Sequence, residues 1–221
     1  AWKLASNVLN AFLLFLVVAC GFLAVVTPWL IGLIAPGFDG QQKDLAISLT
    51  RIMFLSPVFF GLSSVFSSIL HYFDRFLAYA LAPIFYNLGI IFGIIFLYPL
   101  FGLVGLVYGV ILGAALHLLI QVPAAFSAGF RYSAFLDFNS PGLRNIFKLM
   151  LPRIIGSAGY HINLIVITAI ASTLTAGSIA IFTLAMNLLS IPVSIIALSL
   201  ATAVFPALSE SFAQGDEAKF L

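Results

Sequence analysis

The residues best suited to binding chemistry lie in the last third of the chain. The apolar stretch KLMLPRIIGSAGYHIN, residues 148–163, carries polar and helix-breaking residues, among them Pro152, Arg153, Gly156, His161 and Asn163. Ionisable residues inside a membrane-spanning helix are costly and usually face the interior of the bundle. These positions therefore make residues 148–163 the first candidate for a polar surface inside a protein.

Three of these residues could share one helix face. At 100° per residue, His161 lies about 80° from Arg153, and Asn163 lies about 80° to the other side. Hydrogen bonding between helices would account equally well for His161, Asn163 and Asn187. Arg153 could instead extend its guanidinium to the cytoplasmic interface and act as a topology anchor. Both alternatives remain open beside a shared polar face.

Helix-breaking residues accompany the polar ones. Pro152 and Gly156 flank Arg153, while Pro192 follows Asn187 and Ser190 in NLLSIP, and a further proline lies at Pro206. Broken helices at membrane depth are tolerated where neighbouring helices or a water-filled cavity satisfy the freed backbone groups. We predict conformational hinges at Pro152, Gly156 and Pro192, with static kinks as the alternative.

Enzyme chemistry has little support in the sequence. The single cysteine, Cys20, lies in an apolar run and is typical of a buried thiol. The three histidines, His71, His117 and His161, lie in different segments without metal-ligand spacing. GxSxG, HExxH and P-loop motifs are absent from the sequence. We expect neither an enzyme nor a resident cofactor.

Composition places these residues in a membrane protein. Hydrophobic residues make up 63% of the chain and charged residues 7%, with a mean hydropathy of +1.21; a soluble protein carries about 25% charged residues. No charged residue lies within 4–38, 76–130 or 154–209. Since a spanning helix needs about 20 apolar residues, these runs indicate a polytopic membrane protein.

The fold class expected is all-α, a membrane bundle of six spans. Their ranges are 8–34, 48–71, 78–98, 102–127, 147–174 and 177–212. Such long unbroken runs exclude the short alternating strands of a β-barrel. The chain divides into four spans over 1–127, a cytoplasmic loop with a short helix over 128–147, and two proline-bent spans over 148–221. Ser140 and Pro141 are typical of an N-cap and a first helical position.

Positive charge predicts the orientation. Six spans place seven basic residues on one side, namely Lys3, Arg75, Arg131, Arg144, Lys148, Arg153 and Lys219, and only Lys43 and Arg51 on the other. The positive-inside rule makes the first side cytoplasmic. The net charge of +2 thus reflects topology, and no nucleic-acid partner is expected because no basic patch with interleaved aromatics exists.

Glycines indicate how two spans pack. The third span carries Gly89 and Gly93, and the fourth carries Gly105, Gly109 and Gly113. Small residues four apart let helix backbones approach closely in lipid. We interpret them as bundle packing and assign them no function.

Four stretches resemble a known family. They are IAPGF (34–38), SSILHYFDRFLAYALAPIFYNLGII (67–91), KLMLPRIIGSAGYHINLIVITAIAS (148–172) and IPVSIIALSLATAVFPALSESFAQGD (191–216). The chain is similar over essentially its whole length to the MviN/MurJ family of lipid II flippases, in the multidrug/oligosaccharidyl-lipid/polysaccharide exporter superfamily. The resemblance implies a fourteen-span, two-lobed transporter of the bacterial cytoplasmic membrane, of which this chain corresponds to spans three to eight, so we expect a piece of a longer protein.

The resemblance also implies a mechanism and partners. Lipid II, with its undecaprenyl chain, would enter a cationic cavity from the cytoplasm and leave outward by alternating access, in a monomer surrounded by membrane lipids. Arg suits the pyrophosphate because its planar guanidinium binds two oxygens at once. Some members are also implied to bind a coupling cation.

The sequence departs from the family at three positions. Asn187 stands where a cavity arginine is usual, Ile167 stands where an Asp or Asn associated with cation binding often occurs, and Arg153 replaces a residue that is typically small. These differences put head-group affinity and ion coupling in question. We hypothesise that Arg153 partly replaces the missing cavity cation.

Three functions remain open at this stage. The first is flipping of a lipid-linked precursor. The second is export of another polysaccharide-lipid or a small compound by a related transporter, although a small-molecule antiporter would be expected to carry acidic residues within its spans. The third is a non-transporting membrane scaffold, which the losses at Asn187 and Ile167 would favour.

Overall fold

The structure is a computed structural model that describes residues 2–198 and residue 204. Its helices follow one another along the chain as α1 (Trp2–Ile34), α2 (Gly40–Met53), α3 (Leu55–Tyr72), α4 (Phe76–Phe92), η1 (Gly93–Leu97), α5 (Tyr98–Phe101), α6 (Leu103–Leu119), α7 (Gln121–Ser127), α8 (Pro141–Ser172), α9 (Ser178–Pro192) and η2 (Val193–Leu198). The segments η1 and η2 are π-helical. The described residues contain no β-strand.

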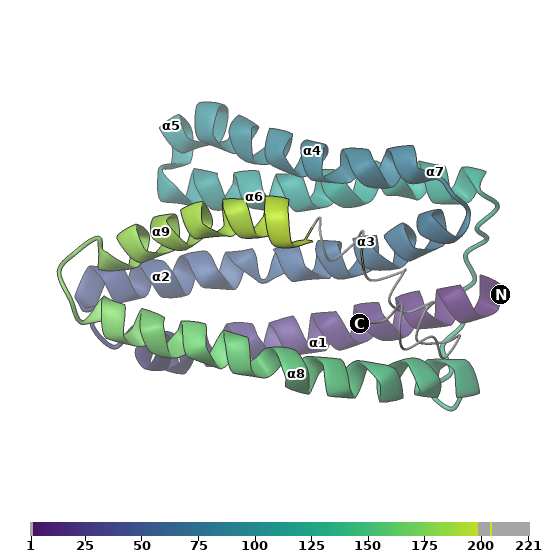
Figure 1. Cartoon of the computed structure of the whole chain (residues 1–221), viewed down its shortest axis with the longest axis horizontal. Coiled ribbons are helices and arrows are strands. Elements are labelled where there is room, and N and C mark those ends of the chain that lie inside the picture. Colours follow the sequence, from purple (N-terminus) through teal and green to yellow (C-terminus); the bar gives the residue numbers. More distant parts are fainter. Residues whose placement is uncertain (1, 199–203, 205–221) are drawn as a thin grey trace.

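These helices confirm the all-α bundle and its six spans. Within the described part of the chain, six stretches are long and apolar enough to cross a membrane, namely Trp2–Ile34, Gly40–Tyr72, Phe76–Phe101, Leu103–Ser127, Pro141–Ser172 and Ser178–Ile195. They run side by side, with the turns gathered at two opposite ends (Figure 1). We call the end with the start of α1, residues 73–75 and residues 128–140 the inner end, and the opposite end the outer end. The charge rule predicts that the inner end is cytoplasmic.

The second span is longer than its predicted range of 48–71. It starts at Gly40, with Asp39 as N-cap, and continues to Tyr72 with a single interruption at Phe54. The polar residues 41–44 can be helical because a helix exposes most of them at the outer end, where Gln41, Gln42 and Asp44 are exposed. The interruption lies just before Pro57, whose missing N–H leaves the preceding turn without one hydrogen bond.

The turns between spans occur where the backbone needs unusual dihedral angles. Gly102 and Gly177 have positive φ angles of 60° and 94°, which glycine adopts without steric cost. The turn predicted over 98–103 is thereby confined to Gly102, and helix continues to Phe101. Residues 128–140 form no regular helix, and α8 begins at Pro141 with Ser140 as its N-cap.

The glycine residues bring α4 and α6 into backbone contact, as predicted. A Cβ added at Gly109 would lie 2.6 Å from the Cα of Gly93, and one added at Gly89 would overlap the backbone of Gly113. Gly105 lies equally close to the backbone of Leu97 in η1. This close approach is the packing that small residues permit between membrane helices.

An apolar core holds the inner end together. It is formed by buried residues of α1, α3 and α7 and of the segment after α7, namely Leu9, Phe66, Ile69, Leu70, Ala125 and Phe130. The ring of Trp2 stacks on Phe73 at 5.4 Å between centroids and meets Phe130 edge-on at 5.7 Å. The start of α1 is therefore fixed against both the 73–75 turn and the segment leading to α8.

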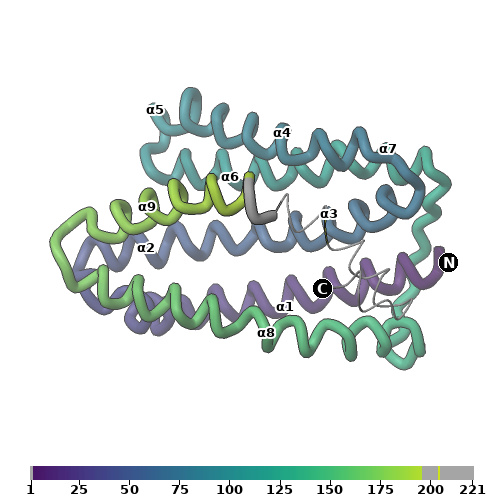
Figure 2. Tube along the Cα trace, in the orientation of Figure 1, coloured from purple at the N-terminus to yellow at the C-terminus, as the bar shows by residue number. Residues whose placement is uncertain are grey.

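The last span is described only in part. Helix α9 contains Pro192 near its end and passes directly into the π-helical turn Val193–Leu198. Helix α8 packs against α1, and α9 follows α8 after a turn at the outer end (Figure 2). Pro206 and the predicted end of this span at 212 lie outside the described residues.

Candidate functional site

Arg153 lies at a groove between three helices. The groove has a volume of about 520 Å³ and is lined from α1, α3 and α8 by Val8, Phe12, Ser64, Val65, Ser68, Leu143, Ile146, Phe147, Met150 and Arg153. Arg153 is the only charged residue among them, and it is exposed. Twelve residues beyond Pro141, it lies roughly 18 Å along α8 from the inner end.

The serines of the groove are held by their own helix. The Ser64 hydroxyl donates to the Gly61 carbonyl at 2.7 Å, and the Ser68 hydroxyl donates to the Ser64 carbonyl at 2.9 Å. Each hydroxyl oxygen keeps acceptor capacity for a further partner. The site thus combines one cation and two hydroxyls with otherwise apolar walls.

The groove continues toward the inner end. An adjoining cavity of about 460 Å³ shares Val8, Val65, Ser68 and Ile146 with the first and extends to the aromatic residues Trp2, Tyr72 and Phe73. We call the two cavities together the inner groove. A long apolar chain fits such walls, and an anion fits the Arg153 end, because a charge taken from water needs a partner of opposite sign.

The remaining predicted site residues do not line the inner groove. His161 and Asn163 are exposed on α8, where the His161 ring contacts Tyr160 with 5.5 Å between centroids. Asn187 and Ser190 are exposed on α9, and the Ser190 hydroxyl donates to the Asn187 carbonyl at 2.6 Å. The structure therefore brings Arg153 together with residues of α1 and α3 and not with these four.

The predicted hinge positions differ in their surroundings. Helix α8 is continuous through Pro152, and a Cβ at Gly156 would meet no described atom within 4 Å beyond the helix's own backbone. Pro192 precedes the π-helical turn 193–198. π-Helical turns and prolines are common causes of helix kinks, so the α9–η2 junction has two of them in succession.

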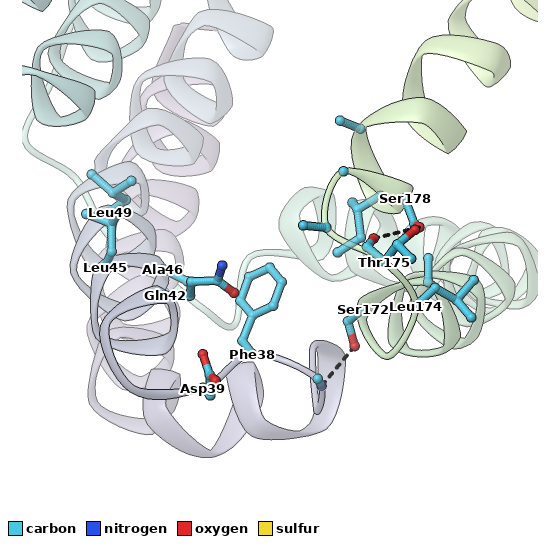
Figure 3. A pocket seen from close by; sticks show the side chains of 16 residues that line it. Phe38, Asp39, Gln42, Leu45, Ala46, Leu49, Ser172, Leu174, Thr175 and Ser178 are labelled. Atoms are coloured by element: carbon cyan, nitrogen blue, oxygen red, sulfur yellow. Dashed lines mark hydrogen bonds between the residues drawn. The ribbon is translucent and has the colours of Figure 1, made fainter.

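A separate cavity, the outer cavity, lies at the outer end, between the α1–α2 loop and the α8–α9 turn. It has a volume of about 690 Å³, with Phe38, Asp39 and Gln42 on one side and Leu174 and Thr175 on the other (Figure 3). At its edge the backbone N–H of Gly37 donates to the Ser172 hydroxyl at 3.1 Å. Gly37 and Ser172 thus connect these two parts of the chain directly.

Comparison with known proteins identifies the family. A sequence profile described as "Lipid II flippase MurJ" matches residues 2–221. The chain belongs to the MurJ family. This agrees with the resemblance drawn from the four sequence stretches, and the family name describes a flippase, in line with the expectation of a transporter and not an enzyme.

Individual MurJ relatives cover most of the chain. A probable lipid II flippase MurJ of Buchnera aphidicola subsp. Acyrthosiphon pisum is 35% identical over 211 residues, which is 94% of this chain and 41% of that protein. The lipid II flippase MurJ of Burkholderia cenocepacia is 28% identical over 87% of this chain and 39% of its own length. The probable lipid II flippase MurJ of Borreliella burgdorferi is 31% identical over 82% of this chain and 36% of its own length.

The chain spans about two fifths of the length of these MurJ relatives. Together with the six spanning helices, membership of the family makes it part of a multi-pass protein of the bacterial inner membrane. This part of a MurJ protein includes the inner groove and the outer cavity. It also includes the contacts between the first four spans and α8.

A polar network inside the MurJ spans was missed by the sequence analysis. The side chain of Gln121 donates to the Ser63 hydroxyl at 2.6 Å and accepts from the Ser67 hydroxyl at 2.6 Å, while His117 Nδ1 lies 2.7 Å from the same Ser63 oxygen. Ser63 and Gln121 are completely buried. The sequence signal for this network is two pairs of polar residues spaced four apart within apolar spans, Ser63 with Ser67 and His117 with Gln121.

A metal or cation site is not evident in the part of the MurJ chain that the structure describes. Residues 2–198 contain no group of three or more His, Cys, Asp or Glu side chains able to hold a metal ion. Ile167, at the position that the family resemblance associates with cation binding, is half-buried on α8. We assign no residue of this segment to a coupling cation.

Proposed function

We propose that the complete protein moves lipid II from the cytoplasmic to the outer leaflet, and that this chain supplies one wall of its binding site. The observation that carries the proposal is Arg153 at the end of the apolar inner groove, in a chain of the MurJ family. Lipid II has the complementary chemistry, a pyrophosphate between a polar head and a long apolar chain.

Each part of the groove has a role in this proposal. The Arg153 guanidinium binds pyrophosphate oxygens through its planar pair of N–H groups. Ser64 and Ser68 present hydroxyl oxygens beside it. The apolar walls toward Trp2 and Tyr72 accept a segment of the undecaprenyl chain. Binding in the inner half of the membrane fits loading from the cytoplasmic side.

The remaining predicted residues belong to the outward half of the cycle in this proposal. His161, Asn163, Asn187 and Ser190 form polar positions on the exposed faces of α8 and α9, where we propose that they contact the head group after it leaves Arg153. Pro152, Gly156 and Pro192 are the proposed bending points. The monomeric state stays a prediction.

Complementation tests the function. We would express the complete gene in cells depleted of their own lipid II flippase, alongside Arg153→Ala, Arg153→Lys and Arg144→Ala versions. Arg144 is the matched control because it is an arginine of α8 that does not line the inner groove. We expect growth from the native gene and the control, loss of growth with Arg153→Ala, and partial growth with Arg153→Lys, which keeps the charge but not the planar fork.

The outcomes separate the possibilities. Full growth with Arg153→Ala would remove Arg153 from the proposal. No growth from the native gene despite normal membrane expression, together with rescue by Asn187→Arg, would indicate a flippase scaffold adapted to another substrate or no longer transporting. Direct lipid II translocation by the purified native protein would confirm the substrate.

A further inference from the structure

The connection between α7 and α8 is attached to the start of α1 by buried side chains. The Asn7 amide donates to the Asp137 carbonyl at 2.8 Å, and the Asp137 N–H donates back to the Asn7 Oδ1 at 2.7 Å. Asn7 is completely buried. One side chain thus satisfies both backbone groups of a residue 130 positions away, much as a neighbouring β-strand would.

Two more residues of α1 extend this attachment. The Ser133 N–H donates to the Ser6 hydroxyl at 3.1 Å. The Asn10 amide donates to the Phe135 carbonyl at 3.0 Å, and the Tyr132 hydroxyl donates to Asn10 Oδ1 at 2.9 Å. The bonded backbone positions 133, 135 and 137 alternate along the chain, which is the pattern of an extended segment lying against a helix. We call residues 131–137, held by Ser6, Asn7 and Asn10, the connector clamp.

Apolar packing fixes the segment just before the clamp. Phe130 is 2% exposed and meets the rings of both Trp2 and Phe66 edge-on. The segment from Phe130 to Asp137 is therefore attached to the first four spans by both hydrogen bonds and apolar packing.

Helix α8 is attached much more weakly. Among residues 2–198, the only hydrogen bond that joins α8 to the first four spans and their loops is the one from Gly37 to Ser172 at the outer end. At the inner end its contact is apolar, with Gly142 packed against the Leu4 side chain. Between the clamp and α8 lie residues 138–140, which have no hydrogen bond to α1.

We propose that Ser6, Asn7 and Asn10 are positioning residues for transport, which keep residues 131–137 attached to the first four spans throughout the cycle so that α8 moves about residues 138–140. This inference rests on the proposed flippase function. It places the pivot in three residues outside the membrane spans, none of them buried, where backbone rotation disturbs no helix interior.

Two cysteine pairs test the pivot in the complete protein, in a background without other cysteines. Ser6→Cys with Ser133→Cys closes the clamp, and Leu4→Cys with Gly142→Cys joins α1 to α8. Lipid II movement would be followed in inverted membrane vesicles after oxidation and again after reduction. We expect the first cross-link to leave at least half of the activity and the second to abolish it, with recovery on reduction.

Several results would overturn the proposal. The first is loss of activity when positions 6 and 133 are cross-linked. The second is full activity when positions 4 and 142 are cross-linked. The third is failure of the 6–133 cysteine pair to form a cross-link. Inactivity of the cysteine-free background protein, which keeps the native residues at positions 4, 6, 133 and 142, is a different result, because it would contradict the proposed function and not the clamp.

A readout independent of transport tests the clamp itself. Hydrogen–deuterium exchange at the Asp137 amide should become about tenfold faster in Asn7→Ala, because the variant loses the acceptor of that N–H. Asn87→Ala is the matched control, since among residues 2–198 the Asn87 amide bonds only the Pro83 carbonyl of its own helix. Equal exchange rates at Asp137 in the native protein and Asn7→Ala would contradict the clamp.

Discussion

The Arg51 side chain donates a hydrogen bond from Nε to the carbonyl oxygen of Ala24 at 3.0 Å. In an unbroken helix this oxygen would accept from the N–H of residue 28, but Pro28 has none. A side chain from α2 thus supplies the partner that the proline removes from α1. Because unpaired backbone groups in hydrocarbon cost several kcal/mol, the pair explains how the first span tolerates a proline.

A double-mutant cycle tests this pairing. We expect Arg51→Ala to lower the free energy of unfolding by about 1–3 kcal/mol, the range for a hydrogen bond from a charged donor. In a Pro28→Ala background the restored amide bonds the Ala24 carbonyl, so Arg51→Ala should cost clearly less. The measurement is denaturant unfolding of the complete protein in detergent micelles.

The control is Arg75→Ala, which removes an exposed arginine at the inner end whose side chain makes no hydrogen bond with the described residues. Its effect should be near zero in both backgrounds. An equal cost of Arg51→Ala with and without Pro28 would show that Arg51 does not act through the Ala24 carbonyl.

The buried polar network predicts a second stability effect. In Gln121→Leu the Ser63 hydroxyl loses a donor and the Ser67 hydroxyl loses its acceptor, at a site where Ser63 and Gln121 are completely buried. We expect a loss of about 1–3 kcal/mol in the free energy of unfolding. Gln41→Leu, at an exposed position of α2, should change it little. Equal effects of the two substitutions would contradict the network.

The sequence predicted those features that depend on local composition. The number of spans follows from the length of the uncharged runs, and the contact of Gly93 with Gly109 follows from small residues spaced four apart. Arg153 was found because an arginine is conspicuous in an apolar run. Each of these predictions depends on the pattern of residues within a single segment of the chain.

Features that depend on partners distant in sequence were not predicted. Asn7 and Asp137 are 130 residues apart, and nothing near either residue indicates that they pair. Ser64 and Ser68 became part of the Arg153 groove only once α3 was placed beside α8. The early start of α2 was missed for a different reason, because polar residues at 41–44 are compatible with a loop and with an exposed helix end.

The glycine contact between η1 and α6 yields a third prediction. Gly109→Ala places a methyl group 2.6 Å from the Gly93 Cα, and backbone cannot rotate away as a side chain can. The helices must separate, and we expect a loss of about 1–3 kcal/mol. Gly21→Ala, where the added Cβ meets no described atom within 4 Å beyond the helix's own backbone, should be neutral or stabilising by up to about 1 kcal/mol. Thermal unfolding in micelles compares the two, and similar melting temperatures would contradict the contact.

The outer contact between Gly37 and Ser172 leads to the fourth prediction. A Cβ at Gly37 would overlap the Ser172 carbonyl and lie 2.8 Å from the Thr173 Cα, so Gly37→Ala should hold the α1–α2 loop apart from the α8–α9 turn. A cysteine at Thr175, inside the outer cavity, should then react several-fold faster with a membrane-impermeant maleimide. Gly32→Ala is the matched control, because its nearest neighbour is a flexible lysine amine at 3.7 Å. An unchanged labelling rate in Gly37→Ala would mean that this contact does not control access to the cavity.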